Sequence, residues 1–345
     1  MHTLSLFRLF ILYSLWYIHG IDASSVINNN IMIASTKIDE SNFQLLHVNF
    51  SNKTARYTPI GNVVSNYTLL QGDATAFDYV NKIYYAVLNT MVNSNANFGE
   101  STLFAFNATN GDILWRYTFP INYTMGGLAY EPKLQQLVGF CGELLAGNGY
   151  IHGYCTMSLS PSTLTPTLTI LYDWNYTIKA DADTRALDPL NHHYYHRVYN
   201  TSWNPDYFCT FNSLTGELLT YSQFPIPSLL FEGTRWDTAS HTIYSLGLTY
   251  KGTDLCTVNA NTGDLTCLNV FDRTSTTIEF FADSAVIDPI SNIYYLTVYY
   301  EINGLKTRAV DINRTSPTYG NIIANYTIPD AYFPSNFHVF GTPDE

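Results

Sequence analysis

An internal repeat with a period of roughly 50 residues constrains the fold of this chain more than any other feature of its sequence. Residues 76–85, 186–195 and 286–295 align without gaps, and each has Asp at its third position and Tyr-Tyr at its end. Residues 235–244 form a fourth copy, and residues 128–137 form a degenerate fifth in which Tyr130 takes the place of the Asp. Each copy is typical of a strand, a short polar turn and a second strand rich in tyrosine and β-branched residues.

A second hairpin follows several of these copies. Residues 103–115, 209–219 and 256–266 approximate the pattern apolar-x-apolar-Asn-x-x-Thr-Gly-x-Leu. The glycine in each supplies the positive φ that a tight hairpin turn needs. Two hairpins in each repeat give four strands, which at this period predict one blade of a β-propeller.

The second hairpin pattern resembles the repeats of the quinoprotein-like and YVTN-type β-propellers. The resemblance covers nearly all of the chain after its first residues, and it implies the fold only. Quinoprotein dehydrogenases usually have eight blades, and many carry adjacent cysteines over the cofactor. This chain has no Cys-Cys pair and is too short for eight such blades, so the resemblance implies no quinone cofactor.

Six blades fit the repeats best. The predicted outer strand pairs lie near residues 43–60, 101–119, 152–172, 206–224, 254–271 and 305–327. The first repeat begins at Ile31 with one strand missing, and residues 336–341 form a spare strand that would complete it and close the ring. We therefore expect an all-β chain with a single propeller domain over residues 24–345. A seven-bladed ring and a pair of two-sheet sandwiches are the alternatives.

The N-terminus predicts a cleaved signal peptide over residues 1–23. A basic start ends at Arg8, and an apolar run of about ten residues follows, which is too short for a membrane span. We place the cleavage after Ala23, with Gly20 as the alternative. No later segment has the length and apolarity of a membrane span. We expect a secreted, extracellular protein, with the endolysosomal lumen as the alternative.

N-glycosylation sequons support the same route, because these sites are modified only in the secretory pathway. They occur at Asn49, Asn52, Asn66, Asn107, Asn122, Asn175, Asn200, Asn313 and Asn325. Charged residues make up only 13% of the chain, so glycans are the expected source of solubility. A net charge of -12 also makes nucleic acid and anionic membranes poor partners.

Two cysteine pairs flank predicted hairpin turns. Cys141 and Cys155 lie on either side of one turn, and Cys256 and Cys267 lie on either side of another. Both pairs are candidates for disulfides within one blade, which would leave Cys209 as a small buried side chain. In the alternative, Cys155, Cys209 and Cys256 occupy similar blade positions as interchangeable core residues.

A column of acids appears when the predicted inner strands are aligned. The residues five places before the repeated Asp are Asp73, Asp183, Glu232 and Asp283, and Asn336 takes this position by a weaker alignment. Inner strands of a propeller begin at one mouth of its channel, where a Ca²⁺ ion would relieve the repulsion between converging carboxylates. The alternative is that these acids cap backbone N–H groups between blades.

Motifs of known catalytic sites are absent from the sequence, so an enzyme is not the favoured reading. His192, His193 and His196 are too far apart on a strand, or on opposite faces of it, to form a metal site. We expect a monomeric binding or adhesion module with an extracellular protein or carbohydrate partner. No sequon lies between Asn200 and Asn313, which favours docking over blades four and five. The alternative function is a Ca²⁺-dependent lactonase or esterase acting at the channel mouth.

Overall fold

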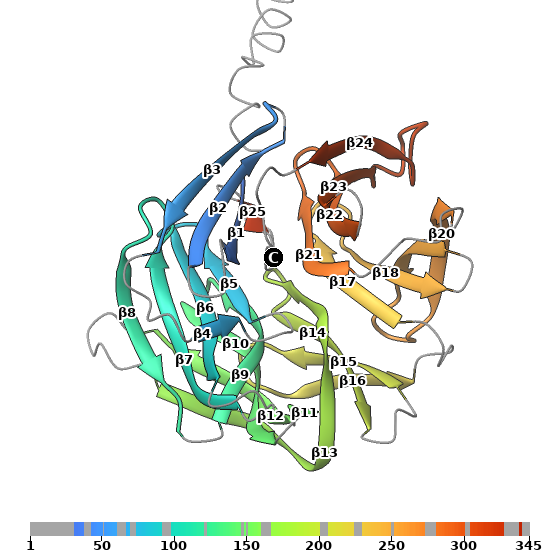
Figure 1. Ribbon diagram of the computed structural model, residues 1–345. Helices are drawn as coiled ribbons and strands as arrows, with labels where there is room; N and C mark the ends of the chain where they lie inside the picture. The colour runs from blue at the N-terminus through green and yellow to red at the C-terminus, as the bar shows by residue number, and fades with distance from the viewer. Residues whose placement is uncertain are drawn as a thin grey trace, which may run out of the picture.

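The computed structural model describes residues 31–37, 43–50, 52–60, 67–69, 74–91, 98–120, 123–145, 148–149, 151–159, 167–200, 206–223, 230–249, 252–272, 281–300, 304–327 and 338–339. The regular structure in these ranges consists of β-strands, and the sheets they form are arranged around a central axis (Figure 1). This is the single all-β propeller that the repeats predict. Nowhere in the described ranges is there a helix of the length and apolarity required to cross a membrane. The predicted signal peptide lies outside them.

Two sheets occupy the N-terminal part of the chain. The first has the order β25–β1–β2–β3, formed by His338–Val339, Ile31–Lys37, Phe43–Asn49 and Thr54–Pro59. The second contains β4 (Tyr67–Leu69), β5 (Thr75–Asp78), β6 (Ile83–Met91), β7 (Phe98–Asn107) and β8 (Ile113–Thr118). In the first sheet, His338 pairs with Ile33 and Val339 with Met32, so the end of the chain completes the sheet formed by its start.

Two four-stranded sheets occupy the C-terminal part. One has the order β17–β18–β19–β20, formed by Leu230–Asp237, Thr242–Thr249, Gly252–Val258 and Leu265–Asp272. The other has the order β21–β22–β23–β24, formed by Phe281–Asp288, Ile293–Tyr300, Gly304–Asp311 and Ile322–Thr327. All neighbouring strands in both sheets are antiparallel.

The fifth sheet has eight strands and differs from the prediction. Its strands are β9 (Tyr123–Glu131), β10 (Gln136–Leu145), β11 (Asn148–Gly149), β12 (Ile151–Ser158), β13 (Thr167–Asp188), β14 (His193–Asn200), β15 (Asp206–Asn212) and β16 (Leu218–Gln223). The 22-residue β13 pairs with β12 through its first part and with β14 through its second part. The described residues thus form five sheets rather than six separate ones, because β13 runs on without a break where a boundary was expected.

The repeated Tyr-Tyr pair packs the sheets together. The first tyrosine is fully buried and faces the strands that come before it in the ring. For Tyr194 of β14 these are β9, β10 and β12, and its hydroxyl donates to the Gly127 carbonyl at 2.6 Å. The second tyrosine alternates to the other face of the strand, so Tyr195 packs against Trp236 of the following group. Hydrophobic clusters of this kind lie between all successive groups of strands in the described chain.

The repeated Asp holds the turn between the two inner strands. Asp188 accepts hydrogen bonds from the backbone N–H groups of Leu190 and Asn191, and Asp78, Asp237 and Asp288 accept the equivalent bonds. In the degenerate copy, Glu131 takes this role, because it pairs with Gln136 and accepts from Lys133 N–H. The predicted equivalence of Tyr130 with the Asp is therefore wrong by one residue.

The disulfides follow the predicted pairing. Cys141 of β10 is bonded to Cys155 of β12, and Cys256 of β19 is bonded to Cys267 of β20. Cys209 is a free, buried thiol, and burial raises its pKa far above the ordinary value for cysteine. The alternative of three interchangeable core cysteines is wrong, since two of the three belong to disulfides.

Candidate functional site

A groove of about 580 Å³ lies where β14–β16 meet the β17–β20 sheet. Its rim is completed by the turn between β23 and β24. The lining residues are His193, Tyr195, Thr210, Leu219, Thr220, Trp236, His241, Thr242, Ile243, Thr257, Val258, Asn259, Ala260, Asn261, Asp264, Thr266 and Arg314. Most of them carry hydroxyl, amide, imidazole or charged groups, which suits a polar ligand.

The repeats place a rigid aromatic floor under this groove. Tyr195 is the second residue of a Tyr-Tyr pair, and Trp236 directly precedes the turn residue Asp237. Their rings stack with centroids 5.7 Å apart and planes inclined by 23°. Trp236 is 6% exposed, and its indole N–H has no acceptor among the described residues. The indole nitrogen itself is covered by surrounding atoms, so the ring supports the groove from beneath.

Hydrogen bonds between strands fix one wall of the groove. The Thr220 hydroxyl donates to the Thr210 hydroxyl at 2.8 Å and lies 3.1 Å from the Ala260 carbonyl. The Ser222 hydroxyl donates to the Asn261 carbonyl at 3.0 Å. These bonds dock the β19–β20 turn on β16. The two sides of the groove are therefore held together before any ligand binds.

The groove lining contains one guanidinium, that of Arg314, and one carboxylate, that of Asp264. The His193 and His241 imidazoles also line it. Asp264 already accepts a 2.7 Å bond from the Thr262 hydroxyl. Arg314 donates to the Thr242 hydroxyl at 3.3 Å, and a hydrogen bond with Tyr244 raises the pKa of Arg314.

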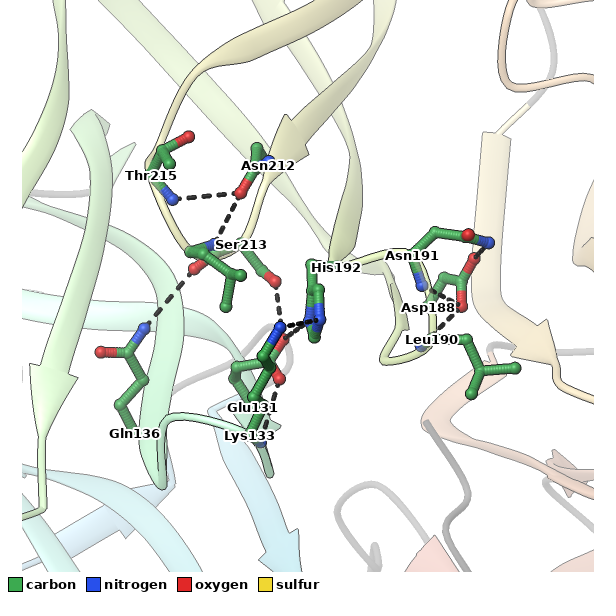
Figure 2. A network of polar contacts seen from close by, with 11 residues as sticks. Glu131, Lys133, Gln136, Asp188, Leu190, Asn191, His192, Asn212, Ser213 and Thr215 are labelled. Carbon is green, nitrogen blue, oxygen red and sulfur yellow. Dashed lines mark hydrogen bonds and ion pairs between the residues drawn. The ribbon is translucent and has the colours of Figure 1, made fainter.

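A second polar cluster lies at the neighbouring junction (Figure 2). It joins the β9–β10 turn to the β13–β14 and β15–β16 turns. The fully buried Glu131 carboxylate accepts a 2.6 Å bond from the Ser213 hydroxyl and lies 3.3 Å from His192 Nδ1. His192 Nε2 lies 3.2 Å from Lys133 Nζ. Glu131 has one more methylene than the Asp of other copies, and its carboxylate bonds groups of the next set of strands.

The chemistry of this cluster is structural rather than nucleophilic. Ser213 is fully buried, and its hydroxyl is bonded to a carboxylate instead of to the imidazole that would take its proton in a serine hydrolase. The three neighbouring histidines have separate partners: His192 faces Glu131, His193 lies 3.3 Å from the Tyr195 hydroxyl, and His196 packs edge-on against Phe140.

The predicted channel acids fall on the inner strands wherever the structure describes them. Asp183 lies on β13, Glu232 on β17 and Asp283 on β21, while Asp73 and Asn336 lie outside the described residues. The pairing register shifts beside each of the three, between Ala180 and Arg185 in β13 and at equivalent places in β17 and β21. Successive inner strands are in contact around the axis (Figure 1). Calcium binding by these acids stays a prediction.

Sequence reasoning missed two buried arginines on these strands. Arg185 on β13 is fully buried and donates to the Thr75 carbonyl of β5 at 3.0 Å. Arg235 on β17 donates to the Ala285 carbonyl of β21 at 2.7 Å. The sequence feature that could have identified them is an arginine two or three residues before the repeated Asp, inside an otherwise apolar strand. They bring positive charge to the same strands as the predicted acids, as a bound cation would.

The sequons occupy two kinds of position. Asn52 and Asn325 are exposed, whereas Asn49, Asn107 and Asn313 are half-buried and their side-chain oxygens accept backbone N–H groups of their own turns. Asn175 lies on β13 and Asn200 on β14. Asn66 and Asn122 lie outside the described residues. Modification of these sites stays a prediction.

Comparison with known proteins identifies the class as β-propeller proteins. No protein-family model matches the sequence, and no curated protein matches it either. Among solved structures, the fold is similar to hydrazine synthase from Kuenenia stuttgartiensis, with a TM-score of 0.54, 9% identity and coverage of 90% of this chain and 95% of that one. A periplasmic gluconolactonase from Pseudomonas aeruginosa has a TM-score of 0.52 and 9% identity, with coverage of 89% and 98%.

An oligogalacturonate lyase from Vibrio parahaemolyticus is similar at a TM-score of 0.52 and 9% identity, with coverage of 82% of this chain and 79% of that one. Identities this low show the fold alone. The resemblance to β-propeller repeats is thereby confirmed at the level of the fold, and function has to be argued from the side chains of this chain.

Proposed function

We propose that the protein is a secreted glycoprotein that binds an extracellular partner through the groove between β14–β16 and β17–β20. The observation that carries the proposal is a polar groove whose two sides are already docked on each other by hydrogen bonds from Thr220 and Ser222. Two disulfides within the described residues support an oxidising compartment.

We further propose that the ring works as six blades, with β13 shared between the third and fourth. The turns of several second hairpins have a glycine with positive φ, and this glycine packs on the outer strand of the preceding sheet. Gly111 packs on Pro59, Gly263 on Ser222 and Gly320 on Leu268. Gly216 packs in the same way on Leu171, in the first part of β13. That part therefore serves as an outer strand, while residues 184–188 serve as an inner one. The groove then lies between blades four and five.

The distribution of sequons supports this surface. No sequon lies between Asn200 and Asn313, the segment that supplies most of the groove lining. Asn313 directly precedes the lining residue Arg314, so a glycan on Asn313 would restrict access at that rim and leave the β14–β20 side for the partner. A glycan is bulky and hydrated, and a partner cannot pack closely over a modified site.

Adding a glycan to the groove tests the proposal. Asn261→Thr turns residues 259–261 into Asn-Ala-Thr, which is the natural sequon at the equivalent turn, residues 107–109. The exchange leaves Gly263 in place, where φ is +74° and a Cβ would lie 3.2 Å from Ser222. We expect the wild-type protein to bind at least one probe in an array of extracellular polysaccharides and matrix proteins. The glycosylated variant should bind that probe at least about tenfold more weakly.

Thr109→Ala is the matched control, since it removes the sequon from the equivalent turn outside the groove and should leave binding unchanged. Mass spectrometry must show a glycan on Asn259 of the variant. Normal binding by that glycosylated form would contradict the groove as the binding surface. If the wild-type protein binds none of the probes, that result would contradict a binding function.

A second candidate, a Ca²⁺-dependent hydrolase, is supported by the acids of the inner strands. Asp183, Glu232 and Asp283 lie beside register shifts in strands that contact one another around the axis. The fold is also similar to that of a periplasmic gluconolactonase. Calcium held there would polarise a lactone or ester carbonyl. This function would use the channel rather than the groove.

Calcium addition separates this candidate from the first. If calcium binds the native state, it raises the melting temperature in proportion to RT ln(1 + [Ca²⁺]/Kd), and the double variant Asp183→Asn with Asp283→Asn loses the response. Hydrolysis of a panel of lactones and esters should then stop on addition of a chelator. If Ca²⁺ does not change the melting temperature of the wild-type protein, the result would favour a role for these acids in capping backbone N–H groups or in pairing with arginines.

A further inference from the structure

The turn between β2 and β3 differs from the second-hairpin turns that contain glycine. In three of those turns, an asparagine is followed four residues later by a glycine with positive φ, as Asn107 is by Gly111. Asn49 is followed by Lys53 instead, which adopts the same left-handed conformation with φ of +54°. A lysine cannot pack as closely on the preceding blade, because a Cβ on Gly111 would lie 2.3 Å from the Pro59 carbonyl oxygen.

A pocket of about 300 Å³ lies beside the Lys53 turn, where the first sheet meets β24 of the last one. Val48 and Phe50 are buried and form its apolar part, and the Phe50 ring stacks on Tyr295 with centroids 4.7 Å apart. At the turns that contain glycine, the turn packs directly on the outer strand that precedes it in the ring. Lysine in place of glycine thus accounts for an open space at the junction where the ring closes.

Two sequons form most of this pocket. Five of its eight lining residues belong to them, two from the sequon at residues 52–54 and three from the sequon at residues 325–327. Asn325 itself lines the pocket and is exposed on β24, as a residue that carries a glycan must be. Glycans on both sequons would keep a macromolecular partner away from the pocket. A sugar attached to the chain itself is the occupant that this arrangement favours.

Resting on the proposed secreted glycoprotein, we propose that the first sugar of a glycan on Asn325 fills this pocket and bridges the last blade to the first. Attachment bonds Asn325 Nδ2 to C1 of a lipid-linked oligosaccharide. The lipid pyrophosphate leaves with the electron pair of its bond to C1, and Nδ2 gives up one proton. The acetyl methyl group of that sugar packs on Phe50 and Tyr326, and its hydroxyls bond Lys53 and Thr54. The glycan thereby replaces the contact that a turn glycine makes at other junctions.

Loss of this glycan should lower the thermal stability of the full-length secreted protein. Thr327→Ala removes the sequon and Thr327→Ser keeps it, so the two variants differ chiefly in the glycan. We expect Thr327→Ala to melt about 2 to 4 °C below Thr327→Ser. Thr109→Ala removes the Asn107 sequon beside a tightly packed glycine turn, and it should shift the melting temperature by less than about 1 °C. Mass spectrometry measures the occupancy of each site.

The variant Lys53→Gly links the effect to the pocket. Glycine lets this turn pack on β24 as the other turns pack on their neighbours, and the Asn52 sequon is kept because only its middle residue changes. In the Lys53→Gly background, the difference in melting temperature between Thr327→Ala and Thr327→Ser should disappear. A peptide N-glycosidase that acts on the native wild-type protein should also release the Asn107 glycan well before the Asn325 glycan.

The outcomes separate this inference from the proposed function. An unmodified Asn325 beside other modified sequons would overturn the inference, and so would equal melting temperatures of Thr327→Ala and a glycosylated Thr327→Ser. A difference that persists in Lys53→Gly would place the effect of the glycan outside the pocket and overturn it too. Thr327→Ala should bind the array probe like the wild-type protein, because the groove lies at another junction. Absence of glycans from every sequon would contradict the proposed glycoprotein itself.

Discussion

Deletion of residues 336–345 should prevent secretion or lower the free energy of unfolding by roughly 3 kcal/mol or more. The deletion removes β25, which pairs with Met32 and Ile33 of β1 and contacts β21. It leaves backbone groups of β1 without partners at the closing point of the ring, and each such buried group costs about 1 to 3 kcal/mol. Immunoblots of the medium and thermal denaturation of the secreted fraction measure the effect.

A shorter deletion of residues 341–345 is the control, because it keeps both residues of β25. It should be secreted and should melt near the wild-type temperature. If the longer truncation is secreted fully and is equally stable, closure by the C-terminal strand is wrong.

Replacement of Arg185 should destabilise the fold more than any exposed arginine substitution does. We expect Arg185→Met to destabilise the fold by about 1 to 3 kcal/mol, because it leaves the Thr75 carbonyl without its guanidinium donor. Urea denaturation measures the loss from the midpoint at constant slope. Arg116→Met, at an exposed position, should change stability by less than about 0.5 kcal/mol.

Combining Arg185→Met with Asp183→Asn identifies the partner of the guanidinium. If the two charges are paired, the double variant is more stable than the sum of the single effects predicts. Strict additivity would assign the Asp183 carboxylate to other groups. A stability loss below about 1 kcal/mol in Arg185→Met would contradict a structural role for this arginine.

The sequence predicts the propeller well because each of its signals is local. The Asp turns, the Tyr-Tyr pairs and the glycines with positive φ recur at fixed spacing, so a short segment specifies its own hairpin. Both disulfides were also predictable, since each pair flanks one turn. Closure by residues 338–339 followed from counting strands rather than from any motif.

Features that depend on neighbouring repeats could not be predicted in this way. The unbroken course of β13 and the role of Glu131 appear only when two groups of strands are in contact. The same is true of the groove, whose walls come from segments between His193 and Arg314. The sequon-free stretch between Asn200 and Asn313 supplies most of the lining, but no short motif indicates the aromatic floor.

The positions of the disulfides determine how this ring can come apart. Each covalent link joins strands of one group, at sequence separations of 14 and 11 residues, and neither crosses a junction between groups. The junctions of the described chain depend on packed side chains and on hydrogen bonds such as those of Glu131 and Arg235. Mechanical load would thus open the ring while every covalent bond stays intact. Within the first sheet, β25 pairs with β1 through only two residues, so we expect this C-terminal strand to detach early under load.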